Sequence, residues 1–188
     1  LPVDRPGYEE ETLDLDMART ALVGMHCWNI GCPDGPPVDV NYCVGMGWPD
    51  STKEAARIMT EVIRPAMDAA RAAGMTVCHV ESDWMDHQYP EVPSRRDEAA
   101  SSGVRSRQQQ HMLDRAHGPE YLRDSPLARM KRAKIVSPAG DESLFFYSDT
   151  FDAYLKQRSI DTLIYTGFAT DMCILARRAE AGPCSLVG

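Results

Sequence analysis

The chain has 188 residues, of which 43% are hydrophobic and 26% charged, and this is the composition of a soluble globular protein with one ordinary domain. The formal net charge of −8 disfavours the phosphate contacts on which nucleic-acid binding depends. No apolar run approaches the roughly 18 residues that a membrane span needs. We therefore expect a single domain over residues 1–188 that binds neither nucleic acid nor a membrane.

The cysteines and the N-terminal segment indicate a cellular compartment. The six cysteines form no CxxC pair, and two of them lie in apolar runs, where a free thiol behaves as a small hydrophobe. Residues 1–17 are acidic and lack the apolar core of a secretory signal. We expect reduced thiols, a cytoplasmic protein and an acidic N-terminal arm over residues 1–17.

Short apolar runs alternate with helical patterns along the chain. The predicted strands cover residues 20–26, 75–81, 133–137, 161–167 and 184–188. The predicted helices cover residues 51–74, 149–159 and 173–182. In the first helix Ser51 is the expected N-cap, and Ile58, Val62 and Met67 give it an apolar side. This alternation predicts an α/β fold in three layers, α/β/α, around a Rossmann-like doubly wound parallel sheet.

A polar segment over residues 85–130 interrupts this alternation, and we interpret it as a lid-like insertion. Residues 85–135 hold ten Lys and Arg against seven Asp and Glu. Such an excess of positive charge favours an anionic substrate, although a solvated helical face is the commoner explanation.

Candidate site residues follow the predicted strands, because ligands of open parallel sheets bind beyond the carboxyl ends of the strands. The residues in these positions are His26, Glu81 to Trp84, Ser137 to Glu142, and Gly167 to Cys173. Cys173 would begin a helix, whose free N–H groups stabilise a thiolate or an oxyanion. Buried packing is the alternative role for this cysteine.

The segment "TLIYTGFATDMCIL" around Cys173 resembles the nucleophile segment of the isochorismatase-like cysteine hydrolases, which include nicotinamidase, isochorismatase and N-carbamoylsarcosine amidase. The similarity extends through "RTALVGMHCWN", "AARAAGMTVCHVESDW" and "FFYSDTFDAYLKQRSIDTLIYTG". It implies that Cys173 is the nucleophile and that the N–H groups of Ala169 and Cys173 form the oxyanion hole. It also implies a cis peptide bond between Phe168 and Ala169.

Two positions depart from the family pattern, which activates its cysteine with an Asp after the first strand and a Lys after the third. His26 stands in the Asp position, and imidazole is the usual base for a cysteine nucleophile. No Lys occupies the second position; Asp141 or Glu142 lies there, and we prefer Glu142 because its side chain reaches further. The prediction is a Cys173, His26 and Glu142 constellation, with a hydrogen-bonded core histidine as the alternative for His26.

Metal ligands and pocket walls complete the candidate site. Nicotinamidases bind a metal through an Asp-x-His pair; here Asp83 matches the Asp, but Met85 occupies the His position. We expect no metal and no cofactor, and we interpret His79, Glu81 and Asp83 as a solvated cluster on one face of a strand. Aromatic residues that could wall the pocket are Trp84, Phe168 and Trp28, with Trp48 and Tyr42 as further candidates; core packing is the alternative for each.

The predicted function is hydrolysis of an amide or ureide-type C–N bond in a small molecule through a Cys173 thioester. The basic segment favours an acidic substrate. The alternatives are a non-catalytic member of the family that binds a small molecule or a partner, and an isochorismate-type ether hydrolase. Relative to the family, the chain ends soon after Cys173, and the apolar surface left open would suit a second copy. We therefore expect a homo-oligomer.

Overall fold

The computed structural model describes residues 12–39, 48–93 and 126–168, several positions between 111 and 124, and the backbone of residues 185–187. The predicted helix over 173–182 and most of the predicted insertion over 85–130 lie outside these residues. Within them, no helix is long and apolar enough to cross a membrane.

Five parallel strands form the central sheet, in the order β3-β2-β1-β4-β5. The strands are β1 (Thr20–Met25), β2 (Thr76–Val80), β3 (Ser143–Phe145), β4 (Thr162–Gly167) and β5 (Ser185–Val187). All six residues of the central strand β1 are buried, because layers cover both faces of the sheet. This burial explains why its sequence is apolar without alternation.

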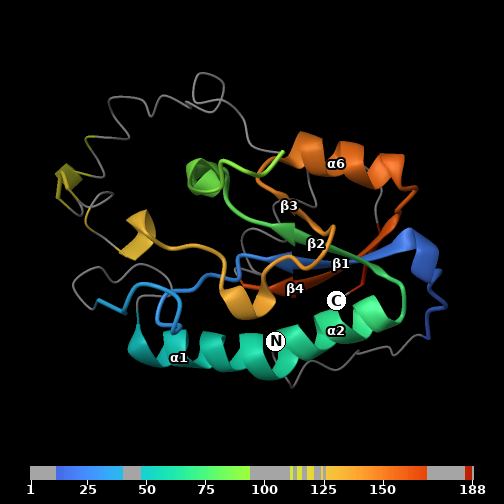
Figure 1. The fold of residues 1–188 in the computed structure, drawn as a ribbon, viewed down its shortest axis with the longest axis horizontal. Helices are drawn as coiled ribbons and strands as arrows, with labels where there is room; N and C mark the ends of the chain where they lie inside the picture. The colour runs from blue at the N-terminus through green and yellow to red at the C-terminus, as the bar shows by residue number, and fades with distance from the viewer. Residues whose placement is uncertain are drawn as a thin grey trace, which may run out of the picture.

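Helices cover the two faces of the sheet (Figure 1). α1 (Pro49–Ile58), the π-helical turn η4 (Met59–Ile63) and α2 (Arg64–Ala72) follow one another along one face. α6 (Ser148–Gln157) covers the opposite face. Alternate β1 residues divide between these layers: Val23 packs with α6, and Leu22 packs with η4 and α2. The predicted three-layer α/β/α fold is confirmed.

The strand predicted over residues 133–137 is wrong. These residues include a short 3-10 helix, η7 (Lys134–Val136), and the third strand forms later, as β3. Ala133 and Val136, three positions apart, are both buried in the layer with α2, whereas Ile135 is exposed. A spacing of three fits a 3-10 turn, while a strand would bury every second residue.

The first helix also differs in detail from its prediction. It begins at Pro49 with Trp48 as N-cap, so Ser51 lies inside the helix. Among the described residues, the other 3-10 helices are also short: η1 (Met17–Arg19), η5 (Asp83–Gln88) and η6 (Pro126–Ala128).

Candidate active site

His26 lies directly after β1, at the carboxyl edge of the sheet. Its backbone N–H donates to the carbonyl of Val80 on β2, and its φ of 50° is left-handed, a conformation in which His is enriched among non-glycine residues. The side chain is 4% exposed, yet Nδ1 has no hydrogen-bond partner among the described residues. Within the described part of the chain, His26 is therefore buried with one ring nitrogen unpaired.

The carboxylate beside His26 belongs to Glu81, which follows β2. Glu81 Oε2 lies 3.6 Å from His26 Nδ1 and accepts a hydrogen bond of 2.9 Å from Trp28 Nε1. Oε1 accepts one of 2.7 Å from Arg132 Nη1. Glu81 has no exposed surface, so it is not part of a solvated cluster as predicted.

The pairing of two short segments fixes Arg132 over the end of β1. Trp28 and Arg132 form an isolated antiparallel bridge, and the N–H of Ala133 donates to the carbonyl of Cys27. The buried guanidinium also donates to the carbonyls of Val136 and Gly24. A Cβ at Gly24 would lie 2.5 Å from Arg132 Nη2, so this glycine leaves the space that the guanidinium occupies.

The ends of β1 and β4 lie side by side at the same edge. Met25 pairs with Gly167 in the sheet register, and the N–H of Phe168 donates to the carbonyl of Met25 at 3.1 Å. The chain thus leaves β4 next to the residue that precedes His26. Ala169 and Cys173, and with them the expected oxyanion hole and cis peptide bond, lie outside the described residues.

Glu142 lies in a different place from the one predicted. It precedes β3, at the amino edge of the sheet, because the third strand forms after this residue and not before it. Its carboxylate binds His79 Nε2 at 2.8 Å, Arg71 at 2.6 and 3.0 Å, and the N–H of Ala139 at 2.9 Å. The predicted support of His26 by Glu142 is therefore corrected: the structure places Glu81 beside this histidine.

Electrostatics of the Glu142 cluster follow from burial and hydrogen bonding. Burial lowers the pKa of His79 to about 4, so the imidazole is neutral at pH 7 and donates its Nε2 proton to the carboxylate. Partial burial alone would raise the pKa of Glu142, but the bonds from His79, Arg71 and Ala139 outweigh it and lower this pKa to about 2. Glu142 is an ionised structural carboxylate.

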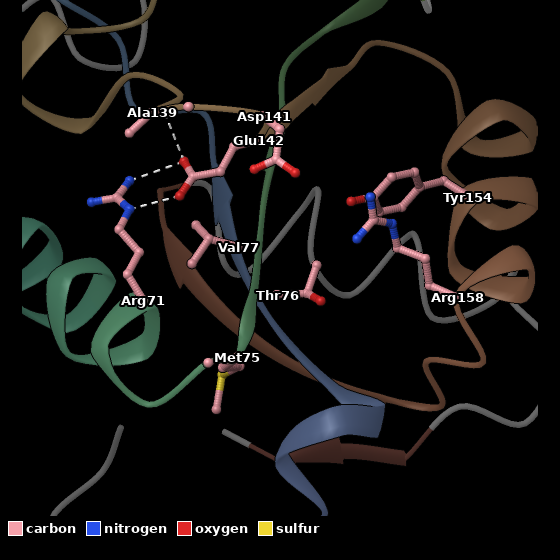
Figure 2. A pocket seen from close by; sticks show the side chains of 11 residues that line it. Arg71, Met75, Thr76, Val77, Ala139, Asp141, Glu142, Tyr154 and Arg158 are labelled. Atoms are coloured by element: carbon pink, nitrogen blue, oxygen red, sulfur yellow. Dashed lines mark hydrogen bonds and ion pairs between the residues drawn. The ribbon is translucent and has the colours of Figure 1, made fainter.

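A cavity of about 440 Å³ opens at this amino edge, between α2 and α6 (Figure 2). Arg71 and Glu142 line one side, where they bind each other. Tyr154 and Arg158 line the other, with the guanidinium 4.7 Å from the centre of the phenol ring. The cavity lies at the end of the sheet opposite to His26, so of the predicted catalytic residues that the structure describes it contains Glu142 but not His26.

The described residues contain no group of three or more His, Cys, Asp or Glu side chains that could bind a metal ion. Asp83 is exposed and accepts from the N–H of Trp84, whereas His79 is directed to Glu142. The three residues expected to share one cluster therefore have separate surroundings.

The aromatic candidates also have different surroundings. Trp28 stands next to His26, with ring centres 5.4 Å apart, and its half-buried indole suits a pocket wall. Trp84 and Trp48 are exposed, and the half-buried Phe168 packs against the core on the α1 and α2 side. Tyr42 lies outside the described residues.

Comparison with known proteins assigns the family. The family model of the isochorismatase domain matches residues 40–181, well over half of the chain. The chain belongs to the isochorismatase family. It is 30% identical over 170 residues to a ureidoacrylate amidohydrolase RutB of Azorhizobium caulinodans, covering 87% of this chain and 70% of that protein. It is 30% identical over 180 residues to the RutB of Stutzerimonas stutzeri, covering 92% of this chain and 67% of the relative.

A solved structure shares the isochorismatase-family fold. The crystal structure of a cysteine hydrolase from Pseudomonas syringae pv. phaseolicola matches with a TM-score of 0.51 and 18% identity, over 90% of this chain and 68% of that one. The family model and the two relatives confirm the predicted membership of the isochorismatase-like hydrolases.

Sequence reasoning missed the buried ion pair of this family member. Glu81 was among the candidate site residues because it follows a strand. Arg132 was counted only as one of the ten basic residues of segment 85–135. No local pattern marks an arginine that enters the core, since its burial depends on a glycine more than 100 positions away.

Proposed function

We propose that the protein is a cysteine hydrolase that cleaves an amide or ureide-type C–N bond of a small molecule through a thioester on Cys173. One observation carries the proposal: β4 ends beside β1, so the segment that leads to Cys173 starts next to His26. Two relatives that are ureidoacrylate amidohydrolases support a ureide-type substrate.

The proposed reaction uses His26 and two residues of the segment that follows β4. His26 takes the proton of the Cys173 thiol, and the thiolate attacks the substrate carbonyl. The N–H groups of Ala169 and Cys173 stabilise the oxyanion of the tetrahedral intermediate. The C–N bond then breaks, the protonated His26 gives its proton to the leaving nitrogen, and the acyl group remains on sulfur. A water molecule, deprotonated by His26, hydrolyses the thioester and restores the thiol.

Alkylation by iodoacetamide tests the nucleophile. We expect Cys173 to react at pH 6–8 at least about tenfold faster than a free cysteine, because a base beside it raises its thiolate fraction. His26→Ala should slow this reaction. Peptide mass spectrometry resolves the six cysteines, and Cys27 and Cys78 provide internal references, because burial raises the pKa of their thiols to about 11 and about 12.

Hydrolysis of a panel of small ureides, amides and enol ethers tests the substrate class. We expect turnover of a ureide or amide that Cys173→Ser and Cys173→Ala both abolish. Ordinary reactivity of Cys173, together with tight binding but no turnover, would instead identify a binding protein. Ether cleavage that survives Cys173→Ser would identify a hydrolase without a covalent intermediate.

A further inference from the structure

The proposed base has an unsatisfied atom on the side away from bulk water. His26 Nδ1 is buried and without a hydrogen-bond partner in the described part of the chain, and leaving a buried polar atom unpaired is costly. The charged atom next to it is Glu81 Oε2, at 3.6 Å. This separation is about half an ångström longer than a hydrogen bond, and catalytic hydrogen bonds are often long before substrate binds.

The neighbouring bonds hold Glu81 in place for this contact. Oε2 accepts one hydrogen bond from Trp28 Nε1, and Oε1 accepts one from Arg132 Nη1. A carboxylate oxygen accepts two hydrogen bonds, so Oε2 retains capacity for an N–H from His26. Among the described residues, Glu81 Oε2 is the one carboxylate oxygen within 4 Å of His26 Nδ1.

Arg132 has a second effect, because a charge buried in the core is costly unless an opposite charge pairs with it. The guanidinium supplies the opposite charge inside the core and is itself held by the carbonyls of Val136 and Gly24. The Glu81 carboxylate, which has no exposed surface, is therefore paired with an opposite charge.

We propose that Glu81, held by Arg132 and Trp28, is the positioning residue that orients His26 for catalysis. A proton on Nδ1 directed at Glu81 leaves Nε2 free to accept the proton of the Cys173 thiol, and the carboxylate then stabilises the imidazolium. The inference rests on the proposed function, since it assigns a partner to the proposed base.

The first test is Glu81→Gln, read out by the rate of Cys173 alkylation between pH 5 and 9. We expect the rate constant at pH 7 to fall about 10- to 100-fold, as part of the roughly 10²- to 10⁴-fold effect of a positioned base. The pH midpoint of the reaction should also move, which a purely structural effect would not produce. Nitrogen NMR of labelled histidine should show the Nδ1–H tautomer of His26 in the parent and lose this signature in the variant.

Because Glu81→Gln leaves the Arg132 charge buried and unpaired, that variant could unfold. The double variant Glu81→Gln, Arg132→Gln removes both charges and keeps a neutral pair, and Trp28→Phe removes one bond to Glu81 while leaving the ion pair. Circular dichroism establishes that each is folded. The matched control is Glu142→Gln, another carboxylate between a histidine and an arginine, which should leave the Cys173 pH profile and the His26 tautomer unchanged.

The outcomes separate this inference from the proposed function. Slow alkylation of Cys173 in the parent, with no effect of His26→Ala, would overturn both. Fast alkylation that His26→Ala slows but the folded double variant does not would overturn the role of Glu81 alone. An unchanged His26 tautomer in that variant would overturn it as well.

Discussion

At Gly167, β4 lies so close to β1 that no side chain fits. Its φ is 127°, and a Cβ added there would lie 1.9 Å from the carbonyl oxygen of Met25. The same carbonyl accepts from the N–H of Phe168. A hydrogen atom in place of a side chain therefore allows the chain to leave the sheet beside His26.

Replacing this glycine should have a large effect on stability. For Gly167→Ala we expect a loss of more than about 4 kcal/mol, beyond the range of most substitutions, because the methyl group meets backbone that cannot move aside. Denaturation by urea provides the measurement. The control is Gly74→Ala, where φ is 73° but no atom lies within 4 Å of the added Cβ, so only about 1–2 kcal/mol is expected. Equal losses in the two variants would contradict the steric explanation.

In the layer formed by α1, η4 and α2, the π-helical turn η4 determines which residues face the sheet. Arg64 N–H bonds the carbonyl of Met59, five residues earlier, and Pro65 has no N–H and would crowd the carbonyl four residues before it. The π-helical turn ahead of the proline accommodates both effects. As a result Met59, Ile63 and Met67 face the core.

Two adjacent residues of η4 provide a direct test of this arrangement. Ile63 is 1% exposed and Val62 is 52% exposed, although both are branched and apolar. Ile63→Ala should lower the free energy of unfolding by about 2–5 kcal/mol through lost burial and a cavity. Val62→Ala should change it by less than about 0.5 kcal/mol, as is usual for the surface. Urea denaturation measures both, and the reverse order would mean that the helix turns its other side to the sheet.

At the scale of elements, the sequence predicts what depends on local pattern. The strands at 20–26, 75–81 and 161–167 are continuous apolar runs next to turns, and all three form, with small shifts at their ends. Val62 was expected on the apolar side of the first helix, and a π turn is not visible in a pattern of period 3.6. The run at 133–137 has the composition of a strand, but its burial is set by contacts with α2 and Cys27, which lie far away in the chain.

The candidate site shows the same limit. Position after a strand placed His26 at the carboxyl edge, because topology alone determines which loops gather there. The partner of His26 could not be predicted in this way, since one misplaced strand moved Glu142 to the wrong edge. Its replacement by Glu81 depends on a buried Arg132, whose position is a tertiary property.

Across the whole molecule, buried or partly buried charged groups occupy both edges of the sheet. Glu81 and Arg132 lie near the carboxyl edge, and Glu142 and Arg71 lie near the amino edge. Glu142 also binds His79, the fourth residue of β2. In both groups one carboxylate binds an arginine and faces a buried histidine. Glu142 and Arg71 line the cavity at the amino edge, and together with His79 they connect α2, β2 and the loop before β3. The titration of these residues therefore affects the stability of the whole fold.

Stability should therefore fall as the pH falls from about 6.5. Since burial lowers the pKa of His79 from 6.5 to about 4, the unfolded chain binds more protons than the folded one between these values, which favours unfolding. The loss across this window is on the order of 3 kcal/mol. Below pH 4.5, protonation of Glu142, whose pKa in the folded protein is about 2, should reduce stability further in the same direction.

Urea denaturation at half-unit steps from pH 8 to pH 4 measures this dependence, and His79→Gln isolates its source. Glutamine keeps a donor for Glu142 but has no proton to gain in this range, while the other four histidines remain in both proteins. We expect the variant to start less stable at pH 8 and to lose less stability between pH 6.5 and pH 4 than the parent. Parallel curves for the two proteins would show that His79 titrates alike in the folded and unfolded chains. The acid sensitivity would then belong to other groups.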